Sequence, residues 1–214
     1  MEIIQKIPIE EVPKTFGGLA MFYLEKTLYI AKNKKASVVH VVPDRYREVS
    51  IKNADRARRG RSMQEPTMTI NVYSEEQKTT IQWKRFLASG HNKDQLIEFF
   101  FNCWRKLCIE NQDCLLVIGH DTKCHSILYT GSEPKVQSVP ELFCSHEEAD
   151  TRLLLQCRYA AKSNSSVVIQ SPDTDVLVIT MSKCHDIGAN VFFVTGRGDQ
   201  RRTIDITAMN KYFG

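Results

Sequence analysis

Residues 145–181, SHEEADTRLLLQCRYAAKSNSSVVIQSPDTDVLVITM, carry the clearest succession of secondary-structure signals in the chain. Ser145 can cap a helix whose apolar side chains recur on one side, and residues 162–164 form the polar cluster that ends it. The β-branched run Val167–Gln170 follows directly and predicts a buried strand, and a second apolar run spans Val176–Met181. A helix that leads within a few residues into a strand is typical of an α/β domain.

The same kinds of signal recur on both sides of this segment. Helices are predicted where apolar residues recur at helical spacing, and strands where β-branched runs are bounded by turn residues. Such an alternation predicts an α/β fold with a mainly parallel sheet. The expected helices are 16–31, 83–87 and 94–109, and the expected strands are 37–42, 114–119, 191–194 and the hairpin pair 126–130 and 135–139.

The composition fits one folded domain and excludes several other classes of protein. The chain has 214 residues, 42% hydrophobic and 25% charged, which excludes general disorder, a collagen-like fibre and a coiled-coil rod. We expect a single domain over residues 1–214, with its core at about 16–214. No run reaches the roughly 18 to 20 apolar residues of a spanning helix. The charged start of the chain, and seven cysteines at irregular spacing, predict an intracellular protein with reduced thiols and no membrane segment.

Positive charge is concentrated in one short segment of the chain. Between Arg45 and Arg61 there are seven basic residues and two acidic ones, whereas the remaining sequence is almost neutral. Such a patch suits a polyanion, because each Lys or Arg placed near a phosphate releases condensed counterions. A solvated helix face would show the same charge pattern, so both interpretations stay open. On the first, DNA or RNA is the partner, and its backbone is contacted by Arg45, Arg47, Lys52, Arg56, Arg58 and Arg59.

Acidic residues occur at three places that an α/β fold brings to one edge of a sheet. Asp44 follows one strand, Glu148 and Asp150 open a helix, and Asp173 and Asp175 follow another strand. The carboxyl ends of parallel strands and the amino ends of helices meet at one edge, so we expect these acids to converge. Clustered carboxylates repel unless a cation lies among them, and oxygen donors without His or Cys suit Mg²⁺ or Mn²⁺. Such ions activate water for the cleavage of a phosphodiester.

Each acidic group also has a purely structural interpretation. Glu148 lies three residues after Ser145, which is the spacing of a capping box, and Asp150 would complement the helix dipole. Asp44 and Asp173 each follow a proline and fit ordinary Asx turns. Their grouping at one predicted sheet edge favours a metal site over three separate structural explanations.

Three segments resemble, in order and spacing, the PIN-like nucleases of the flap-endonuclease branch. They are VVPDRYREVSIKNADRARRGRS at 41–62, SHEEADTRLLL at 145–155 and VVIQSPDTDVLVI at 167–179. They look closest to a group of animal proteins with HEEADTR and DTDV signatures, many of them derived from mobile elements. The resemblance spans about Ser37 to the end of the chain. It implies a three-layer α/β/α fold with a mainly parallel central sheet.

The resemblance also implies a ligand set and an activity. In that family an Asp ends a strand before a basic segment, an E-x-D pair opens a helix, and a D-x-D pair follows the next strand. Glu147 is an additional acid whose role stays open. The residues that would hold Mg²⁺ or Mn²⁺ and carry the catalysis of an endonuclease or 5′-exonuclease are Asp44, Glu148, Asp150, Asp173 and Asp175.

Two elements of the family have no counterpart in this sequence. Its first strand, which ends in an Asp, is not found before Thr15, and its Gly-Cys-Asp motif and helix-hairpin-helix are not found before Gly214. We therefore expect the N-terminal strand and the C-terminal helical region to be absent, which would leave a sheet edge able to pair with a protein partner. One alternative is a pseudonuclease or transposon-derived remnant that only binds nucleic acid or protein. Another is an RNase H-like transposase fragment, which the adjacent acidic pairs fit poorly.

Cysteine lies beside histidine at two places in the chain. Cys124 precedes His125, and Cys184 precedes His185, but no C-x-x-C motif occurs. A structural zinc site would therefore need residues that the fold brings together from different segments.

Overall fold

The computed structural model describes residues 7–43, 68–110, 112–145, 149–196 and 198–213. The chain divides into two compact units, which we call the N-terminal unit, Met1–Glu147, and the C-terminal unit, Glu148–Gly214. Each unit has its own sheet and its own apolar core. The expectation of one domain over the whole chain stays a prediction.

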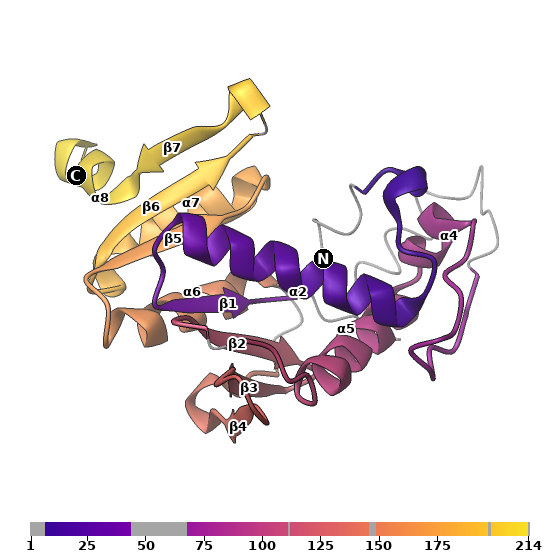
Figure 1. Cartoon of the computed structure of the whole chain (residues 1–214). Coiled ribbons are helices and arrows are strands. Elements are labelled where there is room, and N and C mark those ends of the chain that lie inside the picture. The colour runs from indigo at the N-terminus through magenta and orange to yellow at the C-terminus, as the bar shows by residue number, and fades with distance from the viewer. Residues whose placement is uncertain (1–6, 44–67, 111, 146–148, 197, 214) are drawn as a thin grey trace, which may run out of the picture. The chain divides into compact units, whose positions relative to one another are not determined.

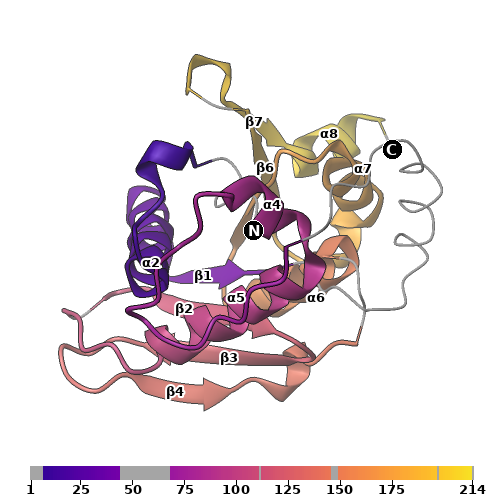
Figure 2. The same ribbon diagram turned by 90° about the vertical axis from the view of Figure 1, so that its right-hand side faces the viewer.

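The N-terminal unit contains a four-stranded sheet with helices packed on one of its faces. The strand order is β1-β2-β3-β4, as Figure 2 shows, and the helices α2 and α5 contact each other and the sheet. The 3-10 turns are η1 (Ile9–Glu11) and η2 (Pro140–Leu142). The helices are α2 (Phe16–Asn33), α4 (Trp83–Ala88) and α5 (Gly90–Trp104), and the strands are β1 (Val38–Val41), β2 (Leu115–His120), β3 (Lys123–Leu128) and β4 (Lys135–Ser138).

Local sequence explains most of these elements. The hydroxyl of Thr15 accepts a hydrogen bond from the backbone N–H of Gly18 at 3.1 Å, which caps α2 where the sequence predicts it. The hydroxyl of Ser89 caps α5 in the same way, because it accepts a hydrogen bond from the backbone N–H of Asn92. The core between helices and sheet is rich in aromatic rings, and its fully buried members include Phe16, Phe86, Phe100, Trp104 and Tyr129.

The C-terminal unit packs three helices on one face of a three-stranded sheet with the order β5-β6-β7, drawn in orange to yellow in Figure 1. Its core is formed by residues on that face, among them Val191, Phe193 and Ile206, which are at most 1% exposed. The helices are α6 (Ala149–Ala161), α7 (Thr174–Lys183) and α8 (Ile206–Phe213), the strands are β5 (Ser166–Gln170), β6 (Asn190–Thr195) and β7 (Arg202–Asp205), and the 3-10 turns are η3 (Cys184–Asp186) and η4 (Gly198–Gln200).

The α/β class is confirmed, but the prediction of a mainly parallel sheet is wrong. Among the strands of the described residues, only β1 with β2 and β5 with β6 pair in parallel, while β2 with β3, β3 with β4 and β6 with β7 pair antiparallel. The physical reason is connection length. Two residues connect β2 to β3, six connect β3 to β4, and six connect β6 to β7. Connections this short cannot carry the chain back to the start of the neighbouring strand, which parallel pairing requires.

Two further observations bear on the sequence predictions. The seven cysteines all lie among the described residues, and none of them forms a disulfide. Within the described part of the chain, no helix is long and apolar enough to cross a membrane.

Candidate functional site

The acidic pair Asp173 and Asp175 lies where β5 passes into α7. Asp173 has an extended backbone and caps the helix, because its Oδ1 accepts the backbone N–H of Asp175 at 2.9 Å. The hydroxyl of Ser171 in turn accepts the backbone N–H of Asp173 at 3.1 Å. Both aspartates are exposed. The Asx-turn interpretation of Asp173 is therefore confirmed, and the same turn presents two carboxylates at the carboxyl edge of the sheet.

The helix α6 brings a further predicted acid to the same edge. It packs against β5 and α7 and reaches β5 through only four residues, so it runs antiparallel to that strand. Its amino end therefore lies beside the carboxyl end of β5. Asp150 is in the first turn of α6. The topology of the C-terminal unit thus places Asp150 on the edge that carries Asp173 and Asp175.

The other members of the predicted set lie outside the described residues. These are Asp44, Glu148 and the basic positions Arg45, Arg47, Lys52, Arg56, Arg58 and Arg59. Among the side chains that the structure does describe, no group of three or more His, Cys, Asp or Glu residues could hold a metal ion. The expected convergence of all five acids stays a prediction.

The donors that are described fit a hard divalent cation. Both are carboxylates, which Mg²⁺ and Mn²⁺ prefer over nitrogen or sulfur ligands. Asp173 uses Oδ1 for the helix cap, and Oδ2 makes no hydrogen bond to any described residue. The cap also fixes the direction of the carboxylate, so the role in capping does not prevent a role as a ligand.

A tight loop between β6 and β7 adds a positive group at this edge. Arg201 donates from Nη2 to the side-chain oxygen of Gln170, the last residue of β5, at 3.3 Å. The loop turns at Gly196, whose φ of 79° is one that L side chains rarely adopt, and a Cβ there would lie 2.1 Å from the carbonyl oxygen of Gln200. Arg201 is exposed, and its bond to Gln170 uses one of its five N–H donors.

A second group of titratable side chains lies in the N-terminal unit, between α5 and the β2–β3 hairpin. Glu98 Oε2 is 2.6 Å from His120 Nδ1, and His120 Nε2 is 2.8 Å from His125 Nδ1. Phe101 stacks on both imidazoles, with ring centroids 4.1 Å from His120 and 4.7 Å from His125. The guanidinium of Arg105 lies over the Phe101 ring, 5.7 Å from its centroid.

Burial and neighbouring charges shift the pKa of His125, the imidazole farther from Glu98. Burial lowers the pKa of His125, and His120, Lys123 and Arg105 lower it further, while the carboxylate of Glu98 acts in the opposite direction. His120 is only 5% exposed. This group was not among the sites predicted from the sequence. The sequence feature that could have indicated it is the pair His120 and His125, one on each side of a two-residue turn. An antiparallel hairpin places these two positions on the same face.

Neither Cys–His pair forms a zinc site within the described residues. Cys124 is fully buried and points to the opposite face of β3 from His125, because neighbours in a strand alternate. Cys184 is buried beside the hydroxyl of Thr207, whereas the adjacent His185 is exposed and pairs with Asp186 at 3.2 Å.

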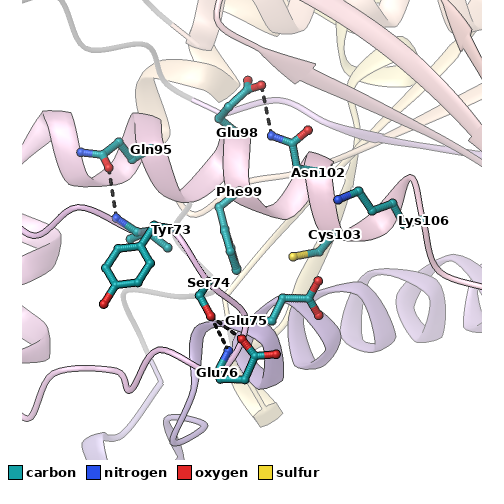
Figure 3. A pocket seen from close by; sticks show the side chains of 11 residues that line it. Tyr73, Ser74, Glu75, Glu76, Gln95, Glu98, Phe99, Asn102, Cys103 and Lys106 are labelled. Carbon is teal, nitrogen blue, oxygen red and sulfur yellow. Dashed lines mark hydrogen bonds between the residues drawn. The ribbon is translucent and has the colours of Figure 1, made fainter.

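A cavity of about 630 Å³ opens between residues 72–76 and the helix α5 (Figure 3). Its lining includes Glu75 and Lys106, which lie close to Cys103. Burial, and secondly the negative charge of Glu75, raise the pKa of Cys103 to about 12. The thiol therefore stays protonated at neutral pH, which excludes it as an activated nucleophile.

No family model, curated protein or solved structure matches this chain. Its own residues therefore define its class: an α/β chain with an acidic turn at the carboxyl edge of a parallel strand pair.

Proposed function

We propose that this chain is a nuclease-like protein that binds nucleic-acid phosphodiesters and cleaves them with Mg²⁺ or Mn²⁺. One observation carries the proposal: Asp173 and Asp175 lie at the carboxyl end of β5, beside the amino end of α6 that contains Asp150. Ligands of open α/β sheets bind at this edge. The PIN-like, three-layer arrangement belongs to the proposal, as do Asp44 and Glu148 as further ligands.

In this proposal the acidic residues bind the metal and the basic residues bind the nucleic-acid backbone. Asp173 and Asp175 supply negative oxygen donors, and the Asx cap of Asp173 holds its carboxylate in one direction before a metal arrives. When bound, Mg²⁺ or Mn²⁺ supplies Lewis acidity and lowers the pKa of water. Arg201, oriented by Gln170, would hold a phosphate of the strand near the acidic turn. The basic residues between Arg45 and Arg59 would extend this contact along the backbone of DNA or RNA.

The direct test is metal-dependent cleavage by the full chain. Labelled single-stranded DNA, 5′-flap DNA and single-stranded RNA are incubated with Mn²⁺, with Mg²⁺ and with EDTA. We expect cleavage of at least one substrate with Mn²⁺ and none with EDTA. A folded sample that binds these substrates but cuts none of them would instead support the pseudonuclease alternative, in which the same surface only binds.

Replacement of Arg201 by glutamine is expected to weaken binding of single-stranded DNA by about fivefold to tenfold and to lower its salt dependence by roughly one unit of slope. The reason is the loss of one phosphate contact while the loop geometry, set by its glycines, is kept. Binding is measured by fluorescence anisotropy in EDTA at several salt concentrations. The matched control is Arg158→Gln, which removes the same charge from the last turn of α6, at the opposite sheet edge. Equal effects of the two substitutions would contradict a specific contact at Arg201.

A further inference from the structure

We propose that Glu98, His120 and His125 form a proton-binding site that joins α5 to the β2–β3 hairpin, keeps its hydrogen bonds with one added proton, and loses the bond between its two imidazoles with a second. The site is independent of the proposed nuclease activity. It lies entirely within the N-terminal unit, and none of its three residues belongs to the acidic turn.

The direction of each hydrogen bond follows from the chemistry of the groups. The carboxylate of Glu98 can only accept, so His120 must donate to it from Nδ1. A neutral His120 then carries its lone pair on Nε2, which accepts from Nδ1–H of His125 at 2.8 Å. The chain of bonds therefore runs from His125 through His120 to Glu98. It leaves the Nε2 of His125 as the basic atom where a proton enters.

One added proton fits this arrangement. It binds at Nε2 of His125, or the shared proton shifts so that His120 becomes the cation and donates to a neutral His125. Both hydrogen bonds persist in either form, and the charge of the added proton is balanced by Glu98. Phe101 keeps its stacked position on both rings, because no ring has to turn.

A second proton does not fit. With both imidazoles protonated, Nε2–H of His120 and Nδ1–H of His125 would face each other across 2.8 Å, two donors with no acceptor between them. Two neighbouring cations also repel, and Lys123 and Arg105 add positive charge from β3 and from the end of α5. The hydrogen bond between the two rings must therefore break, whereas the bond from His120 to the carboxylate of Glu98 can persist.

The sign of the effect on stability follows from linkage. The pKa of His125 is lowered in the folded chain relative to a free histidine, whose pKa is about 6.5. The unfolded chain therefore binds more protons than the folded chain as the pH falls through this region. Stability is complete above about pH 6.5 and decreases below it, towards the pKa of the folded state.

The first measurement is an NMR titration of the imidazoles of the full chain between pH 8 and 4.5. We expect the transition of the His125 imidazole to lie below that of a free histidine, which is at about pH 6.5, and its hydrogen bond to His120 to be lost through that transition. Glu98→Gln keeps an acceptor oxygen but removes the negative charge that raises the pKa of His125, so the His125 transition should move to lower pH. If His125 titrates at or above about pH 6.5, or if its hydrogen bond to His120 survives the transition, the proposal is wrong.

The second measurement is hydrogen exchange of the β2 and β3 amides at pH 7.5 and 5.0, corrected for the intrinsic exchange rate. We expect the wild-type protection to fall about tenfold more over this range than that of His125→Gln. Glutamine can still donate to Nε2 of His120 but cannot become a cation. His185→Gln is the control for loss of an imidazole elsewhere and should behave as wild type. Equal pH dependence in the wild type and His125→Gln would overturn the proposal.

Discussion

The double substitution Asp173→Asn and Asp175→Asn is expected to lower metal-dependent cleavage by at least about 100-fold, which corresponds to roughly 2.7 kcal/mol of transition-state stabilisation. The fold should be unaffected. Asparagine caps a helix as well as aspartate does, so its side-chain oxygen at position 173 can still accept the backbone N–H of residue 175. What disappears is the negative charge that a divalent cation requires. Cleavage with Mn²⁺ is compared after far-UV circular dichroism has shown equal helix content.

The matched control for this variant is Asp186→Asn. Asp186 lies in η3, at the other end of α7, where it pairs with Arg158 at 3.0 Å. Its replacement changes the charge of the same unit and removes a partly exposed ion pair, which contributes little to stability. We expect cleavage within about twofold of the wild type. A folded double variant that cleaves like the wild type would show that these aspartates hold no catalytic metal.

Elements whose signals are local could be predicted from the sequence to within a few residues. The helix α2 and the strand β1 are examples, because Thr15 caps the first and a β-branched run ended by Pro43 forms the second. The hairpin of β3 and β4 was predicted for the same reason, since Gly131 and Ser132 mark its turn. Strand pairing is not local. The mixed sheets depend on which segments the short connections bring together, and no periodic pattern records this.

The run Val176–Met181 shows why a short apolar segment is ambiguous. Its β-branched residues are typical of a strand, and a run of six residues does not distinguish the two periodicities. In the structure it is part of α7, because the cap at Asp173 starts a helix and the hydroxyl of Thr180 bonds back to the carbonyl of Val176 at 2.7 Å. Val176 and Thr180 are the buried residues of this helix.

The two candidate sites differ in how far the sequence could reveal them. Asp173 and Asp175 are neighbours in the chain, so a motif could find them. Glu98 and His120 are 22 residues apart, and they meet because α5 packs on β2. His125 joins them through the pairing of β2 with β3. A site built from packing in this way becomes visible only when the tertiary structure is known.

Replacement of Trp104 by alanine is expected to lower the free energy of unfolding of the N-terminal unit by about 3–5 kcal/mol. The indole is fully buried and stacks on Phe100 and Tyr23, each with ring centroids 5.7 Å away. Its Nε1–H donates to the carbonyl of Ala20 at 2.8 Å, which connects α5 to α2. Alanine removes both the packing and the connection. Such a loss is a large part of the roughly 5–15 kcal/mol that stabilises a typical domain.

Two further substitutions separate packing from hydrogen bonding at this position. Trp104→Phe keeps an aromatic ring but loses the bond to Ala20, so we expect a smaller decrease, about 1–2 kcal/mol. Ile81→Ala, at a side chain that is 89% exposed, should change stability by less than about 0.5 kcal/mol. Urea unfolding is followed by far-UV circular dichroism, because removal of Trp104 alters the fluorescence signal. Equal losses in the alanine and phenylalanine variants would mean that the hydrogen bond between α5 and α2, rather than ring packing, holds these two helices together.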